Sequence, residues 1–163
     1  VWRIPEVEDR LKFLTDQVER ITGLQEFGVY LNKLFTIDAI FLNEDRHMHN
    51  IAVMMNGKGE FDYCPIFDNG GALLTDTTMD YPLDQDELLL MKEVHAKTIS
   101  SDFDEQLDAS EHFYGRNLRF SFTKKDVERL LAKPELNMYD MRIRTRVTNI
   151  FYQQMNKYKY LFY

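Results

Sequence analysis

The sequence predicts a mainly α-helical domain with one small β-hairpin, for two reasons. Apolar residues recur at helical spacing through most of the chain. Two short apolar runs are instead joined by Asn-Gly-Lys-Gly at 56–59, which is a strong hairpin signal. The chain has 163 residues, enough for a hydrophobic core, so we expect residues 1–163 to form a single domain.

Two helices are expected before the hairpin. Residues 6–22 carry apolar side chains at helical spacing, and Gly23 is a suitable stop. Residues 25–42 are apolar over most of a helical circumference, which indicates a buried helix. Residues 43–50 have no periodicity, so we expect a polar loop there.

The hairpin itself is expected to pair residues 51–55 with residues 60–67. Both stretches are short and apolar, and the turn signal at 56–59 separates them. Residues 68–71 contain Asp, Asn and two Gly, which is typical of a turn or loop. The predicted order is therefore buried helix, polar loop, hairpin and acidic turn.

Four further helices are expected in the C-terminal half. Thr123 and Asp126 resemble a capping pair for the third of these, which Pro134 ends. The Arg residues of RIRTR (142–146) alternate, which favours a solvated helix face over a phosphate-binding patch. The expected ranges are 84–98, 100–115, 126–133, and 139 almost to the end of the chain.

Composition argues against several functional classes. The net charge of −7 disfavours binding to nucleic acid or to an anionic membrane, which usually accompanies a basic excess. Cys64 is the single cysteine, which excludes an internal disulfide and a cysteine-based zinc site and favours a reducing compartment. No signal peptide is visible, and no apolar run approaches about 18 residues. We therefore expect a cytoplasmic protein without a membrane partner.

The most informative feature is a set of polar side chains around the expected hairpin. Transfer of a phosphoryl group from ATP needs a carboxylate to accept the proton of the attacking hydroxyl, and oxygen ligands for Mg²⁺. Protein kinases take the carboxylate and one ligand from an Asp and an Asn five positions apart, then a second Asp after a hairpin. Asp45, Asn50 and Asp68 follow this order.

The segments NEDRHMHN (43–50) and PIFDNGG (65–71) resemble the HipA-like serine/threonine kinases. The family pattern is approximately Asn-x-Asp-[Asp/Arg]-His-x-x-Asn, followed by Pro-x-[Tyr/Phe]-Asp. The DRHMHN portion is also similar, more distantly, to phosphoinositide 3-kinase-type loops, but Asn43 and PIFDNGGALL favour the HipA-like family. The resemblance is concentrated in residues 38–75. It implies a protein-kinase-like C-terminal lobe of the HipA C-terminal domain type.

Carried over residue by residue, the resemblance implies a role for each polar position. Asp45 would be the catalytic base, and Asn50 and Asp68 would be Mg²⁺ ligands at the ATP site. His47 would approach the transferred phosphoryl group, as Lys does in other kinases. Asn43 would brace the catalytic loop.

The chain lacks other parts of a kinase. A glycine-rich loop and a strand Lys paired with Glu are not visible, and Gly23 and Gly28 fall at or within expected helices. Because the sequence also begins at Val1 without Met, we expect the C-lobe of a longer kinase whose N-lobe is absent, with little activity alone. The resemblance further implies a bacterial enzyme that phosphorylates Ser or Thr of a protein substrate. In a toxin–antitoxin system, an antitoxin-like DNA-binding partner would restrain it.

Other interpretations stay open. The loop at 43–50 could be a solvated turn after a helix, and Asp68 alone fits an Asx-type turn. His47 and His49 would make a weak zinc pair without a third ligand, and Arg46 is expected to be a structural or exposed charge. The alternative functions are a lipid-kinase-like enzyme and a non-catalytic kinase-fold interaction module.

Overall fold

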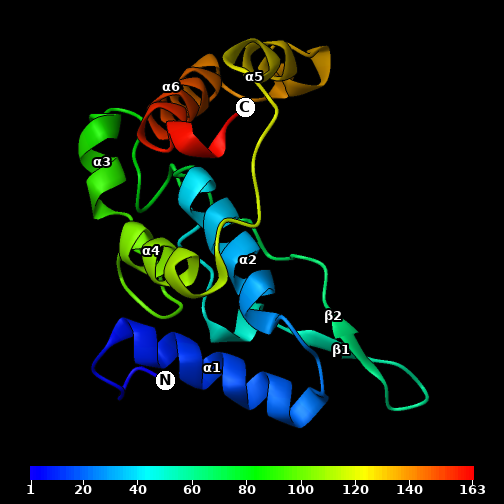
Figure 1. Ribbon diagram of the computed structural model, residues 1–163. Helices are drawn as coiled ribbons and strands as arrows, with labels where there is room; N and C mark the ends of the chain where they lie inside the picture. The colour runs from blue at the N-terminus through cyan, green and yellow to red at the C-terminus, as the bar shows by residue number, and fades with distance from the viewer.

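The computed structural model describes residues 1–163 and confirms a mainly helical chain with one small antiparallel hairpin (Figure 1). The helices are α1 (Val7–Thr22), α2 (Phe27–Phe41), α3 (Glu87–Glu93), α4 (Phe103–Tyr114), α5 (Lys124–Leu131) and α6 (Met141–Lys157). The strands are β1 (Val53–Met55) and β2 (Phe61–Tyr63). Three short 3₁₀ turns are η1 (Met48–Asn50), η2 (Pro134–Met138) and η3 (Lys159–Leu161).

Helix α2 is the centre of the fold. It contacts α1, α4 and α6, and Figure 1 shows it running between α1 at one end of the molecule and α6 at the other. Ten of its 15 residues are buried, as expected for a helix that is apolar over most of its circumference. Gly28 permits the close approach of α4, because a Cβ at this position would lie 2.2 Å from Cζ of Tyr114. Because α2 is central, the point where the chain leaves it determines where the polar loop at 43–50 lies.

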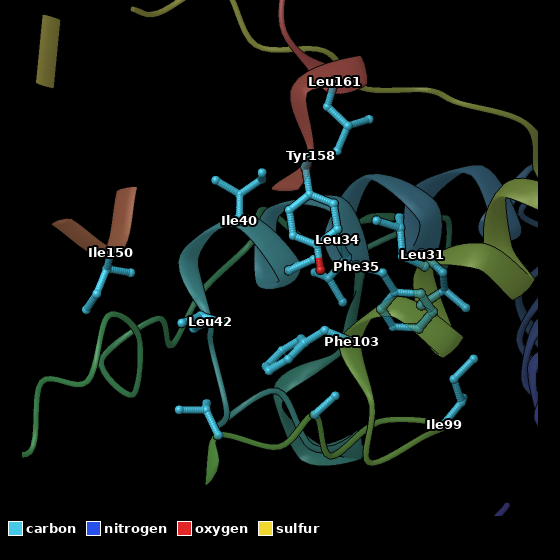
Figure 2. Close-up of a cluster of buried hydrophobic side chains, with 14 of the residues drawn as sticks. Leu31, Leu34, Phe35, Ile40, Leu42, Ile99, Phe103, Ile150, Tyr158 and Leu161 are labelled. Carbon is cyan, nitrogen blue, oxygen red and sulfur yellow. The ribbon is translucent and has the colours of Figure 1, made fainter. Parts of the chain in front are cut away.

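The core gathers side chains from α2 and from segments far apart in the sequence (Figure 2). Burying each large apolar side chain stabilises the fold by about 1.5–3 kcal/mol. The central members are Leu31, Leu34, Phe35, Ile40, Ile99, Phe103, Ile150, Tyr158 and Leu161. One consequence is that the last residues of the chain are packed against α2 and do not extend α6.

Helix starts follow the expected capping chemistry. The side chains of Asp86, Asp102 and Asp140 accept backbone N–H bonds at the starts of α3, α4 and α6. Thr123 and Asp126 form a complete capping box at the start of α5, as the sequence predicted. These local signals account for where the C-terminal helices begin.

The helix predicted over 84–98 was too long, because α3 ends at Glu93. Val94 is already extended (φ −77°, ψ 127°), and Val94, Ala96 and Thr98 are buried on alternate positions. The hydroxyl of Thr98 donates to the carbonyl of Arg46. Tertiary packing therefore overrides the helical propensity of this stretch.

The prediction of a solvated face at RIRTR was wrong for Arg146. Its side chain is 4% exposed, and it donates to the carbonyls of Tyr81 and Pro82, both at 2.6 Å. The Arg therefore ties α6 to the chain before α3. The predicted helix from 139 almost to the end is also shorter, since it runs from Met141 to Lys157 and a parallel bridge between Phe120 and Phe162 follows it.

None of the helices is both long enough and apolar enough to cross a lipid bilayer.

Candidate active site

The polar loop begins where α2 ends, at a residue in the left-handed region. Leu42 has φ 50°, and the N–H of Asn43 donates to the carbonyl of Asp38. The side chain of Asn43 then connects the helix to the loop. Its Nδ2 donates to Oδ1 of Asp38 at 3.0 Å, and its Oδ1 accepts from the N–H of Asp45 at 3.3 Å. Asn43 is 1% exposed, so these hydrogen bonds are shielded from solvent.

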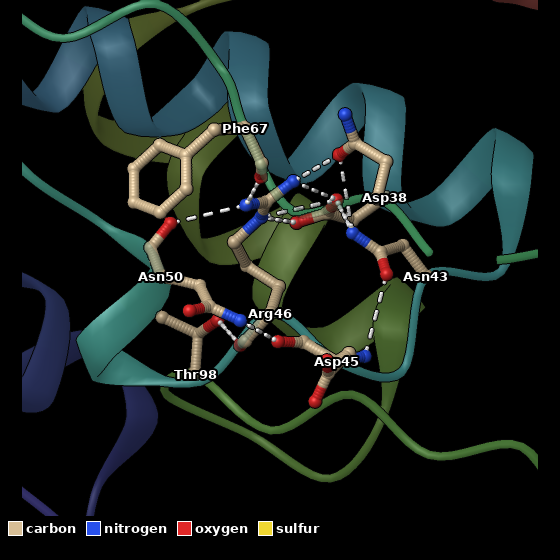
Figure 3. Close-up of polar contacts among 8 residues, drawn as sticks. Asp38, Asn43, Asp45, Arg46, Asn50, Phe67 and Thr98 are labelled. Carbon is tan, nitrogen blue, oxygen red and sulfur yellow. Dashed lines mark hydrogen bonds and ion pairs between the residues drawn. The ribbon is translucent and has the colours of Figure 1, made fainter. Parts of the chain in front are cut away.

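Arg46 is the hub of the site, as Figure 3 shows. Its side chain is 1% exposed, and its Nε lies 3.1 Å from Oδ2 of Asp38, which is fully buried. Nη1 donates to the carbonyls of Asn50 and Phe67. Burial raises the pKa of Asp38 to about 6, an effect that Arg46 and Asn43 oppose. Of the two alternatives expected for Arg46, a structural or an exposed charge, the structure shows the structural one.

The second segment of the site, residues 67–71, lies along the loop. The carbonyl of Phe67 accepts from Arg46, the side chain of Asn69 accepts from Arg46, and the carbonyl of Gly71 accepts from the N–H of Glu44 at 3.4 Å. Asp68 lies between these anchors with φ 54°, and its side chain is exposed. The structure therefore brings the segment that carries Asp68 against the loop that carries Asp45 and Asn50.

Asp45 is the half-exposed carboxylate of the site, with 43% of its side chain accessible. In Figure 3 its carboxylate points away from the guanidinium of Arg46. Its backbone is held, because its carbonyl accepts from Nδ2 of Asn50 at 2.8 Å. Gly71 packs so closely that a Cβ there would lie 2.8 Å from Cβ of Asp45. The carboxylate is thus fixed at its base and open at its tip.

His47 lies beside this carboxylate. Its Nε2 is 3.8 Å from Oδ1 of Asp45, and 42% of its side chain is exposed. Its Nδ1 accepts from the N–H of His49 at 3.3 Å, so the neutral ring carries its proton on Nε2, the nitrogen facing Asp45. The ring is therefore oriented by the backbone of its own loop, with Nε2 near the carboxylate.

The two expected metal ligands can be tested against their hydrogen bonds. The amide nitrogen of Asn50 is committed to the carbonyl of Asp45, which leaves Oδ1 as the atom for a cation. The carboxylate of Asp68 forms no hydrogen bond or ion pair, and the chain contains no cluster of three His, Cys, Asp or Glu residues. Mg²⁺ takes oxygen ligands and is commonly held by one or two carboxylates together with phosphate and water. This donor set fits Mg²⁺ accompanied by a phosphate and does not form a closed protein cage.

Three residues of the site were not singled out from the sequence. Asp38 could have been found, because a carboxylate inside a helix that is apolar over most of its circumference must have a partner. Asn69 and Thr98 carried no such signal, since Asn69 lies in a polar turn and Thr98 lies at the end of a stretch that was expected to be helical. Their partners are remote in the sequence, and only folding brings them together.

Apart from Glu26, the non-glycine residues in the left-handed region lie at or next to the site. Besides Leu42 and Asp68, the consecutive residues Leu73 and Leu74 have φ 58° and 57°. The N–H of Leu73 donates to the carbonyl of Phe41 at 2.8 Å, which ties this turn to the end of α2. Such conformations persist where surrounding contacts hold them, and they concentrate at functional sites.

Comparison of the chain with protein-family models, with curated proteins and with solved structures gives no match.

Proposed function

We propose that this chain is the C-lobe of a HipA-like serine/threonine protein kinase, which transfers a phosphoryl group from ATP to a protein hydroxyl with Mg²⁺. One observation carries the proposal. A half-exposed Asp45, held through its carbonyl by Asn50, lies on a loop that is clamped through Arg46 to the segment bearing Asp68. The order Asp, Asn, hairpin, Asp and the contacts between the two segments support the same chemistry.

The roles of the side chains follow from their surroundings. Bound Mg·ATP supplies the phosphoryl group and the charge neutralisation that its transfer needs. Asn50, through Oδ1, and Asp68 would hold the metal. The exposed tip of Asp45 would orient the attacking hydroxyl and accept its proton.

The neighbouring polar residues would support that carboxylate. Asn43 braces the backbone of Asp45 through a 3.3 Å hydrogen bond. His47, with Nε2 3.8 Å from Asp45, would present its single N–H to a phosphoryl oxygen next to the carboxylate.

The biological setting of the proposal rests on family resemblance alone. The resemblance to HipA-like kinases implies a bacterial, cytoplasmic enzyme that has a protein substrate and an N-lobe that completes the ATP site. It also implies restraint by an antitoxin-like DNA-binding partner. None of these features enters the test of the chemistry.

A phosphorylation assay tests the proposal. The full-length protein is incubated with γ-labelled ATP, Mg²⁺ and either a generic protein substrate or phosphoinositide vesicles, and the label on each acceptor and on the kinase itself is measured. We expect Asp45→Asn to reduce transfer by about 100-fold or more, and Asp68→Asn to reduce it strongly. The matched control is Asp16→Asn, which removes an exposed carboxylate of α1 that forms no hydrogen bond or ion pair.

The outcomes separate the alternatives. Transfer to protein that both site variants abolish and the control variant retains supports a protein kinase. Label appearing in phosphoinositide vesicles in place of protein would indicate the lipid-kinase alternative. Equal transfer by wild type and Asp45→Asn, or no transfer from wild type to either acceptor, would refute the proposal and favour a non-catalytic module.

A further inference from the structure

Asn69 makes contacts that its position in an exposed turn does not suggest. Its Oδ1 accepts a hydrogen bond from Nη2 of Arg46 and a second from Nδ2 of Asn43, at 3.4 Å. Its own amide nitrogen forms no hydrogen bond within the chain. Asn69 therefore acts as an acceptor only, and both of its donors come from the loop that carries Asp45.

These contacts fix Asn69, which directly follows Asp68 in the chain. Asp68 is in the left-handed region, with φ 54°, which a residue other than glycine adopts at a conformational cost. On one side the carbonyl of Phe67 accepts from Arg46, and on the other the side chain of Asn69 accepts from Arg46 and Asn43. The direction of the Asp68 side chain therefore depends on anchors on both sides of it.

We propose that Asn69 is a positioning residue that anchors the segment carrying Asp68 to the loop carrying Asn50, and thereby sets the affinity of Asp68 and Asn50 for a divalent cation. The metal-binding role of the pair rests on the function proposed above. The role of Asn69 rests on the hydrogen bonds.

If Asn69 had a purely structural role, removing its side chain would destabilise the fold. The hydrogen bonds predict a different result. Both donors have a second partner, because Nη2 of Arg46 also donates to Oδ1 of Asp38 at 3.3 Å and Nδ2 of Asn43 donates to the same oxygen at 3.0 Å. Without Asn69 the loop thus keeps its connection to α2, whereas the segment carrying Asp68 loses an anchor. The fold should survive and the metal affinity should fall.

The test measures binding of Mn²⁺, the probe, by electron paramagnetic resonance of the free ion in titrations of the full-length protein. We expect Asn69→Ala to weaken binding about 10- to 100-fold, as for other residues that orient metal ligands. Asn69→Asp keeps an acceptor oxygen in the same place and should bind as tightly as wild type or more tightly. The double variant Asp68→Asn/Asn69→Asp should bind weakly, which shows that Asp at 69 is not itself the ligand.

The matched control is Asn137→Ala, which also removes an exposed Asn whose Oδ1 accepts from an Arg, here Arg144 at 3.0 Å. It should bind Mn²⁺ like wild type. Thermal unfolding of each variant checks that the protein is folded. In the phosphorylation assay, Asn69→Ala should raise the KM for Mg²⁺ while kcat at saturating Mg²⁺ stays close to wild type.

Three results would overturn the inference: equal Mn²⁺ affinity in Asn69→Ala and wild type, equal weakening in Asn69→Ala and Asn137→Ala, or Mn²⁺ binding that Asp68→Asn does not weaken. The proposed function fails separately. A protein that transfers no phosphate but shows the expected order of Mn²⁺ affinities would refute the kinase and retain the role of Asn69.

Discussion

The guanidinium of Arg46 and the carboxylate of Asp38 form an ion pair, with 3.1 Å between Nε and Oδ2, and neither side chain is accessible to solvent beyond 1%. The pair joins α2 to the polar loop, and through Phe67 and Asn69 it reaches the segment after the hairpin. The buried side chain of Arg46 thus connects the three parts of the candidate site.

Replacing Arg46 by Met should destabilise the protein by about 3–5 kcal/mol, because it leaves the carboxylate of Asp38 buried without its cation. The free energy of unfolding at neutral pH, from urea denaturation, measures this. Arg129→Met is the control, since Arg129 is 79% exposed in its ion pair with Asp126 and should unfold close to wild type. Equal stability of the two variants would show that the buried pair adds nothing.

The buried carboxylate also predicts a pH dependence. Burial raises the pKa of Asp38 from 3.8 to about 6 in the folded protein, so the folded state binds this proton more tightly than the unfolded state. The stabilisation that protonated Asp38 adds to the free energy of unfolding is fully present below a pH of about 4. It is lost as the pH rises through about 6.

Comparison with Asp38→Asn isolates this contribution, because the amide does not titrate. The free energy of unfolding of wild type, minus that of Asp38→Asn, should fall between about pH 4 and pH 7, by at most about 3 kcal/mol. Urea denaturation at several pH values provides the measurement. A difference that is flat or that rises with pH would contradict the raised pKa.

Under the proposed function, Gly71→Ala should impair phosphoryl transfer in the full-length protein more than it impairs folding. The new Cβ would lie 2.8 Å from Cβ of Asp45, so Asp45 and the segment at Gly71 must shift relative to each other. Displacement of a catalytic group by about 1 Å costs on the order of 10- to 100-fold in rate. Gly70→Ala is the neighbouring control, since a Cβ at Gly70 meets no atom within 4 Å and should leave the rate unchanged.

Arg146→Leu should cost about 1–3 kcal/mol in the free energy of unfolding, because the carbonyls of Tyr81 and Pro82 lose their donor. Arg142 in the same helix is 68% exposed and pairs with Asp140, so Arg142→Leu should unfold close to wild type. Thermal or urea unfolding of the two variants compares them. If both changes are equally mild, Arg146 is as dispensable as the sequence pattern suggested.

Much of the fold follows from local signals. The apolar circumference of α2, the turn at 56–59 and the capping box of Thr123 and Asp126 each specify an element through contacts within a few residues. Predictions failed where a distant partner decides the outcome. The stretch after Glu93 leaves the helix because Thr98 and its neighbours are buried against the loop and the core, and Arg146 is buried because two remote carbonyls accept from it.

The sequence by itself determined the class of the fold, the order Asp45, Asn50, hairpin, Asp68, and the chemistry that this order suggests, since periodicity, turn residues and motif spacing are local properties. Only the tertiary structure decided that Arg46 is the buried hub, that Asn69 accepts from the loop, and that Gly71 touches Asp45. A buried charge costs several kcal/mol unless it is paired. Which groups pair with Arg46 depends on helix packing and left-handed turns, which bring together residues more than twenty positions apart in the sequence.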